Sequence, residues 1–287
     1  MLILSTGLWR WPATSRRRRR PSSIDPSPKE FVVASQAKDS TRWIDEASAG
    51  GQWNSSVYTV DDESAPLQVP RNKGHEAMVY LTYLIDRYDT LPEYIVFLHG
   101  ERYQWHNDDP KYDTVSIVQR LRLDALRKRG YLNLRCTWNQ GCPGELDLLS
   151  TPKDSDTRAE TAAQYARSFK TLFPGRDLPD QVAVSCCSQF AVTRGKVHER
   201  PRTDYENYRT WLLDTPLEDK LSGRIMEYSW HLIFGMPPVH CPDEQTCYCE
   251  TFGLCDLACT EHGCGRYVYP FGPDRGWWDR FKDSIGV

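Results

Sequence analysis

The segment 99–109 holds the densest group of chemically reactive side chains in the chain. It contains two imidazoles, three carboxylates, an arginine and two aromatic rings. Imidazole nitrogens and carboxylate oxygens are common ligands of divalent cations. We therefore expect a metal site formed by His99, Glu101 and His106, where manganese or magnesium would suit a substrate that carries a diphosphate. The alternative is that His99 hydrogen-bonds inside the fold while the acids are solvated.

A second acid and imidazole pair lies further along the chain. Glu227 and His231 are four residues apart in a helix predicted at 223–234, so we expect them on one helix face. A carboxylate beside an imidazole stabilises the protonated ring, and such pairs serve as general acid and base. We predict that Glu227 or His231 is catalytic and acts as a base on an acceptor hydroxyl. The alternative is a buried pair that ties this helix to the sheet.

Other polar side chains are placed where an anionic ligand could bind. Acidic residues follow the first two predicted strands, at 31–35 and 57–60, and an Asn-Lys pair precedes the helix predicted at 75–88. The N-terminus of a helix presents unpaired N–H groups that favour anions. The alternative is that Glu76 in the first helical turn already satisfies those donors. The predicted nucleotide-binding residues are Asp39, Asp61, Asp62, Asn72 and Lys73.

The elements that must position these side chains follow from apolar periodicity. Continuous apolar runs alternate with segments whose apolar residues recur at three and four residue intervals, a pattern typical of an α/β fold. We predict a single, mostly parallel sheet covered by helices on both faces, with ligands at the carboxyl ends of its strands. Strands are predicted at 31–35, 57–60, 94–98, 131–135 and 181–184, with 190–193 continuing the last, and helices at 75–88, 115–129, 157–173, 200–213 and 223–234.

Ten cysteines predict covalent cross-links. Six of them lie within 241–264 among glycine and proline residues, a segment too poor in apolar side chains to fold by itself. None of their spacings is the C-x2-C pair typical of zinc sites, so we predict disulfides, with His240 and His262 leaving zinc as the alternative. Disulfides imply folding in an oxidising compartment, either the lumen of the secretory pathway or the extracellular space.

The other four cysteines lie in the main domain. Cys136 and Cys142 flank a polar turn and could close on each other. Cys186 and Cys187 would point to opposite faces if they lay on a strand. The pairing among the ten cysteines is left open by their spacing.

The charge distribution excludes some partners. Residues 1–30 carry seven basic and two acidic residues, a charge of +5, which leaves −8 of the total of −3 on the rest of the chain. An acidic body argues against nucleic acid as a partner. We expect residues 1–30 to be either a disordered basic arm or a poor signal anchor. Membrane attachment is expected only if they are an anchor. The sequence gives no indication of the oligomeric state. The predicted units are this arm at 1–30, an α/β domain at 31–238, a cysteine-rich cap at 239–270 and a tail at 271–287.

Several ordered motifs resemble a fungal family called domain of unknown function 3431. The likeness covers roughly residues 31–270. It is carried by motifs such as FVVAS at 31–35, PRNKGHEA at 70–77, WHN at 105–107, GYLNLRC at 130–136 and EYSWH at 227–231.

The layout of this family looks like that of nucleotide-sugar glycosyltransferases with a single α/β domain. In those enzymes the first strand and its loop hold the nucleotide, and a later strand end holds a metal. This chain has His99-Gly100-Glu101 where those enzymes usually have an Asp-x-Asp pair. The resemblance implies a glycosyltransferase-like enzyme that uses a nucleotide sugar and a small-molecule or glycan acceptor.

Two other functions are compatible with the same residues. One is a metal-dependent tailoring enzyme of fungal secondary metabolism, with His99, His106 and His231 around a transition metal. The other is a non-catalytic secreted binding module that presents the cysteine-rich cap and tryptophans such as Trp277 and Trp278.

Overall fold

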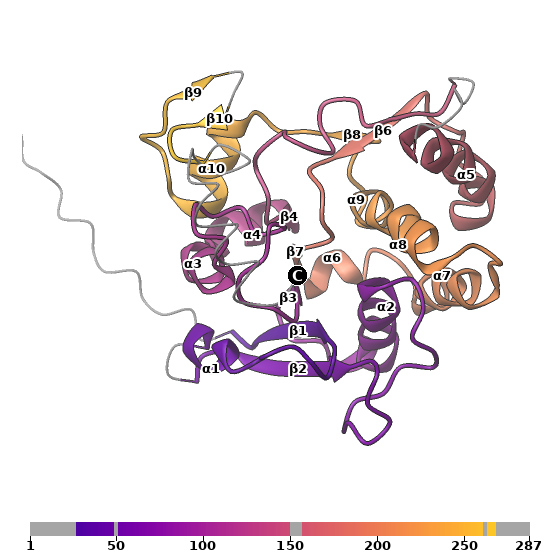
Figure 1. Cartoon of the computed structure of the whole chain (residues 1–287), viewed down its shortest axis with the longest axis horizontal. Coiled ribbons are helices and arrows are strands. Elements are labelled where there is room, and N and C mark those ends of the chain that lie inside the picture. Colours follow the sequence, from indigo (N-terminus) through magenta and orange to yellow (C-terminus); the bar gives the residue numbers. More distant parts are fainter. Residues whose placement is uncertain (1–26, 49–50, 150–156, 261–262, 268–287) are drawn as a thin grey trace, which may run out of the picture.

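A five-stranded sheet with the order β2-β1-β3-β7-β4 lies at the centre of the protein (Figure 1). The computed structural model describes residues 27–48, 51–149, 157–260 and 263–267. The predicted arm at 1–30 lies outside these residues up to residue 26, and the predicted tail at 271–287 lies wholly outside them. The strands are β1 (Lys29–Ser35), β2 (Asn54–Thr59), β3 (Tyr94–His99), β7 (Phe190–Thr193) and β4 (Tyr131–Asn133).

The central sheet is mixed, so the prediction of a mostly parallel sheet is wrong. β1 pairs in parallel with both β2 and β3, whereas β7 runs antiparallel to both β3 and β4. The segment of β7 does not continue the strand before it, because the chain turns between them and enters a different sheet. The carboxyl ends of β1 and β3 nevertheless lie side by side at one edge.

Two smaller sheets accompany the central one. A three-stranded sheet has the order β5-β6-β8, and a two-stranded sheet pairs β9 with β10. Their strands are β5 (Leu146–Asp147), β6 (Gln181–Val184), β8 (Val239–His240), β9 (Cys259–Thr260) and β10 (Gly263–Cys264).

Helices cover both faces of the central sheet (Figure 1). Helices α2, α5, α7, α8 and α9 share one hydrophobic core with one face, and α1, α3, α4 and α10 share a second core with the other. The helices are α1 (Trp43–Ala47), α2 (Glu76–Asp86), α3 (Thr114–Arg120), α4 (Leu123–Arg129), α5 (Thr157–Leu172), α6 (Arg194–Val197), α7 (Arg202–Asp214), α8 (Asp219–Glu227), α9 (Trp230–Ile233) and α10 (Glu244–Phe252), with a 3-10 turn at Tyr88–Thr90.

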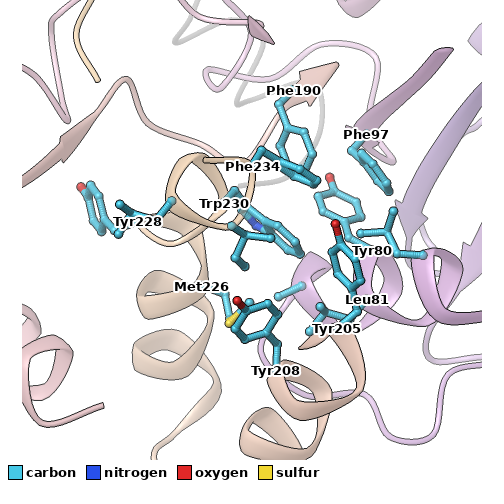
Figure 2. Packing of buried hydrophobic residues seen from close by; sticks show 14 of the residues in the cluster. Tyr80, Leu81, Phe97, Phe190, Tyr205, Tyr208, Met226, Tyr228, Trp230 and Phe234 are labelled. Atoms are coloured by element: carbon cyan, nitrogen blue, oxygen red, sulfur yellow. The ribbon is translucent and has the colours of Figure 1, made fainter. Parts of the chain in front are cut away.

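Aromatic rings dominate the first core (Figure 2). The ring of Tyr80 on α2 lies 4.7 Å from that of Phe97 on β3 and 5.8 Å from that of Trp230 on α9. Phe190 on β7 lies 5.3 Å from Trp230, so strands and helices meet through these rings. Aromatic pairs at such separations add to the free energy gained by burying the rings. This core fixes α2 and the α8–α9 segment, which both contribute to the site, against the sheet.

Two helices predicted as continuous are broken in the structure. The segment 115–129 divides into α3 and α4 because Leu121 and Arg122 are extended, and the N–H of Arg122 donates to the carbonyl of Thr251. The segment 223–234 divides into α8 and α9, and at the break the hydroxyl of Ser229 donates to the carbonyl of Ile225 at 2.7 Å. Long-range contacts and side-chain bonds to the backbone interrupt both helices.

Five disulfides confirm the prediction of disulfides over zinc, and two of them fasten the cap to the main domain. Cys136 and Cys142 do not bond to each other, because their turn instead faces the cap. Two bridges therefore close loops of about a hundred residues, one closes neighbours in the main domain and two lie within the cap. The pairs are Cys136–Cys247, Cys142–Cys241, Cys186–Cys187, Cys249–Cys255 and Cys259–Cys264.

This disulfide content fits a secreted or lumenal protein, because such bonds persist in oxidising compartments. Within the described residues, every helix is too short or too polar to cross a membrane.

Candidate functional site

The site lies where β1 and β3 end. Ala34 of β1 pairs with His99 of β3, so the residues after both strands emerge together. Gly100 allows this close approach, since a Cβ there would meet the Asp39 carboxylate at 2.6 Å and the Cα of Ser35 at 2.9 Å. The first loop and the end of β3 are therefore brought into contact by the absence of a side chain at one position.

Two adjoining cavities open at this edge. One, of about 340 Å³, is lined by the first loop, by Glu101 and by Gln104. The other, of about 620 Å³, is lined by Trp105, Glu227 and the Cys186–Cys187 pair. They share four lining residues, which join them into one hollow. The shared residues are His75, Glu76, His99 and His106.

Gln104 orients the two imidazoles of the hollow. Its side-chain N–H donates to the carbonyl of Glu101 at 3.0 Å, which turns its amide oxygen towards the rings. That oxygen lies 3.3 Å from Nδ1 of His99 and 2.9 Å from Nδ1 of His106, so both rings donate from Nδ1. Burial, followed by the neighbouring His99 and Arg135, holds the pKa of His106 well below its usual range. The neutral ring of His106 then keeps a lone pair on Nε2.

The second ring nitrogen of His99, Nε2, lacks a hydrogen-bond partner among the described residues. This nitrogen is buried, and the nearest carboxylate oxygen of Glu76 is 3.9 Å away. A histidine fixed through Nδ1 with Nε2 unbonded is the usual arrangement of a metal-binding imidazole. His99 and His106 therefore fit as ligands of a divalent ion.

The predicted third ligand does not join them. β3 ends at His99, so strand geometry does not extend to Glu101, whose side chain lies with Asp39 in the smaller cavity. Partial burial, together with the charge of Asp39, raises the pKa of Glu101. Among the described residues, the group of three donor atoms found within 4.8 Å of one another is that of Cys186, Cys187 and Glu227, whose sulfurs are bonded to each other. In the described part of the chain, His99, Glu101 and His106 do not form a closed set of three ligands.

Glu227 brings a carboxylate to the floor of the larger cavity. It is the last residue of α8 and accepts a hydrogen bond from the backbone N–H of Cys187 at 2.6 Å. Burial, with a smaller contribution from the charge of Glu76, raises the pKa of Glu227 to about 7. At neutral pH this carboxyl therefore exchanges a proton readily while it faces the same hollow as His99.

His231 lies elsewhere. The break between α8 and α9 removes it from the face that carries Glu227, and it lines neither cavity. The ring is fully buried, its Nε2 donates to the carbonyl of Pro238 at 3.0 Å, and it stacks on His240. The expectation that Glu227 and His231 share one helix face is wrong, because Tyr228 ends the helix before the second residue.

The predicted nucleotide residues of the first two loops have different roles. Asp39 lines the smaller cavity, and one of its oxygens accepts from the N–H of Gln36. Asp61 accepts from the N–H of Ala37 at 2.7 Å and so shapes the first loop from outside. Asp62 binds the N–H and hydroxyl of Ser64 in its own turn. The structure brings only the first of these three acids to the hollow.

The start of α2 differs from the predicted anion site. His75, at φ 54°, directly precedes the helix, so Asn72 and Lys73 lie outside its first turn, and Asn72 instead lines the smaller cavity. The amino group of Lys73 donates to the carbonyl of Thr215, which directs it towards α7 and its following loop. Glu76 faces His99 instead of capping the helix.

A family model described as protein of unknown function (DUF3431) matches residues 31–250. The chain belongs to this family. Searches of curated proteins and of solved structures each returned no match. All the cavity residues of this DUF3431 member lie within the matched span.

Three contributors to the site were not singled out from the sequence of this DUF3431 member. Gln104 lies two residues before His106, and this proximity of an amide to a histidine is the sequence signal that could have indicated its role. The sequence indicates Glu76 only as a residue that satisfies the N–H groups at the start of the helix. Cys187 contributes its backbone N–H, and the available signal was the Cys-Cys doublet, whose bond requires a turn in place of a strand.

The buried His231 predicts that the fold loses stability in acid. Burial lowers the pKa of His231 to about 3, whereas in the unfolded chain it titrates near 6.5. The unfolded state therefore binds more protons between these values, and stability falls as the pH decreases through this window. We expect roughly 3 kcal/mol to be lost between pH 7 and pH 4 from this group. Urea unfolding of wild type and His231→Gln across this range measures it.

The variant should show a flatter dependence of unfolding free energy on pH. His198→Gln is the matched control, because His198 is exposed and also bonds a backbone carbonyl, that of Tyr88. Equal acid slopes for wild type and His231→Gln would contradict the prediction.

Proposed function

We propose that the chain is a glycosyltransferase-like enzyme in which Glu227 is the general base. The observation that supports this role most is that the Glu227 carboxyl lines a cavity of about 620 Å³, where burial raises its pKa to about 7. A base is most effective when its pKa is near the working pH. Glu227 would take the proton of an acceptor hydroxyl as the oxygen attacks the sugar.

The smaller cavity would hold the nucleotide. It lies at the ends of β1 and β3, which is where open α/β sheets bind their ligands. Asp39 offers a carboxylate to ribose hydroxyls, and Lys38 offers a positive charge to a diphosphate. This placement is consistent with the layout implied by the family resemblance, in which the first strand and its loop hold the nucleotide and a later strand end holds a metal.

A divalent ion such as manganese or magnesium would be held by Nε2 of His99 and of His106. Bound there, it would neutralise charge on the diphosphate of the donor. The role of Gln104 is independent of the ion, since it fixes both rings through Nδ1. A carboxylate oxygen of Glu76 lies 3.9 Å from Nε2 of His99.

Donor binding tests the proposal. We expect one member of a panel of nucleotide sugars, with manganese or magnesium, to raise the melting temperature by roughly 5 to 10 °C at a hundred times its Kd. The Asp39→Ala variant should lose most of this shift. Asp62→Ala is the control, because its carboxylate is engaged in its own turn. No shift with any donor in correctly oxidised protein would remove the proposal.

A metal-dependent tailoring enzyme is the second candidate. The two imidazoles with Nδ1 bonded to one amide oxygen favour it, because this leaves two nitrogen donors for a transition metal. Calorimetric titration with zinc or manganese, read together with the donor panel, separates the candidates. Metal binding that is lost in His99→Gln, in a protein that shows no thermal shift with any nucleotide sugar, supports this second function.

A further inference from the structure

Two adjacent cysteines bond to each other in the wall of the larger cavity. Cys186 and Cys187 form a disulfide with their Cα atoms 3.7 Å apart. Neighbours on an extended strand point their side chains to opposite faces, so this bond is incompatible with a strand. The backbone instead has φ 95° at Cys187 and φ 51° at Ser188. Residues with a Cβ seldom adopt such values, and they persist where the surrounding structure enforces them.

This backbone conformation directs one N–H group at the carboxylate of Glu227. The amide nitrogen of Cys187 lies 2.6 Å from Oε1. Within the described part of the chain, it is the one hydrogen bond that this carboxylate receives. The carboxylate also ends α8, where the helix dipole disfavours negative charge, and it faces the acid Glu76. A short bond from an N–H group to a charged oxygen is among the stronger hydrogen bonds in proteins.

We propose that the Cys186–Cys187 disulfide is a positioning device for Glu227, because the small covalent ring holds the Cys187 amide against the carboxylate. The device keeps the base oriented towards the cavity and favours its ionised form. This inference rests on the proposed function of Glu227, although the hydrogen bond and its effect on the carboxyl can be measured without a substrate.

The ring also connects the two sides of the hollow. The guanidinium of Arg135 lies 3.9 Å from the sulfur of Cys187 and donates to the carbonyls of Trp105 and His106 at 3.0 and 3.1 Å. The segment that carries His106 is therefore fastened beside the disulfide. Opening the ring would loosen the carboxylate on one side and the imidazole loop on the other.

A dithiol can open the ring by thiol–disulfide exchange. Its first thiolate attacks one sulfur, breaks the S–S bond and forms a mixed disulfide with the protein. Its second thiolate then attacks the reagent's own sulfur in that mixed disulfide and releases the second cysteine thiolate. The reagent ends as a cyclic disulfide and has given up two electrons. Cys186 and Cys187 end as thiols that carry the two protons. Without the ring, Cys187 is free to leave the positive φ region and to withdraw its N–H from Glu227.

The titration of Glu227 tests the inference directly. In protein labelled with carbon-13 at glutamate carboxyls, the Glu227 signal is the one missing from Glu227→Gln. Removing a hydrogen bond to the ionised form should raise its titration midpoint by about one pH unit in Cys186→Ser/Cys187→Ser. Amide hydrogen exchange at position 187 should accelerate at least tenfold. The matched control is Cys249→Ser/Cys255→Ser, which removes a short-range disulfide of the cap and should leave both readouts unchanged.

An unchanged midpoint in a folded Cys186→Ser/Cys187→Ser protein would overturn the inference. If that variant does not fold, wild type treated with a dithiol under native conditions, with the opened pair identified by alkylation and mass spectrometry, supplies the same titration. A shifted midpoint with a fully active Glu227→Gln enzyme would reject the proposed base and keep the positioning role. An inactive Glu227→Gln enzyme with no shift would reject the positioning role alone.

Discussion

The Glu227→Gln variant is expected to transfer sugar roughly 10² to 10⁴ times more slowly than wild type, because an amide cannot take a proton from the acceptor. Glutamine keeps the size of the side chain and an oxygen for the Cys187 N–H. Donor affinity should therefore change little. Steady-state kinetics with the donor identified by thermal shift measures both quantities.

The pH dependence of the same reaction should show the base directly. Because burial raises the pKa of Glu227 to about 7, the wild-type rate should increase with pH through that value, as the carboxyl loses its proton. This increase of the rate with pH should be absent in Glu227→Gln. Glu93→Gln is the control, since Glu93 lies outside both cavities and pairs with Arg194. A Glu227→Gln enzyme within a few-fold of wild type would assign the base to another group.

Removal of both long-range disulfides is expected to be the most destabilising change in the chain. Cys142–Cys241 lies within the loop closed by Cys136–Cys247, so either bridge alone still holds the cap near the domain. By loop-closure entropy, opening one bridge should cost about 3 kcal/mol, because the other leaves only a short loop to close. Opening both should cost roughly 7 to 8 kcal/mol, which is comparable to the whole stability of many domains.

The combined variant should therefore lose more unfolding free energy than the sum of the losses in the two single-bridge variants. Denaturant unfolding of Cys136→Ala/Cys247→Ala, of Cys142→Ala/Cys241→Ala and of the combined variant measures the difference. Cys259→Ala/Cys264→Ala is the control, because its loop of 5 residues predicts a loss of about 2 kcal/mol. Additive losses would show that the two bridges act on independent parts of the chain.

Apolar periodicity predicted most of the elements but not their connection. The continuous run of β3 and the repeat within α2 are local signals, and both elements lie within one or two residues of their predicted bounds. The helix predicted at 223–234 breaks at Tyr228 and Ser229, where the hydroxyl of Ser229 donates to the carbonyl of Ile225, and no apolar pattern reports such a bond. The direction of β7 depends on the turn at the Cys186–Cys187 pair, and cysteine pairing is a property of the folded chain.

The sequence predicts part of the candidate site, because some of its residues are recognisable by their chemistry alone. The residue types of His99 and Glu227 indicate acid–base or metal chemistry, and both residues line the larger cavity. Glu101 could not be placed, because its orientation depended on strand geometry beyond the last residue of β3. Gln104 acts through two rings that approach only after the loop folds. Residues that act by orienting others carry little signal in composition or spacing.

The position of β7 bears on how the chain folds during synthesis. β7 pairs with β3 on one side and with β4 on the other, although it follows both along the chain. A nascent chain that has emerged only as far as β4 lacks the strand that joins its two halves, and the edges of β3 and β4 are unpaired. Completion of the central sheet must then wait for residues near position 190, although β1, β2 and β3 can pair with one another before them. This long sequence separation predicts slow folding.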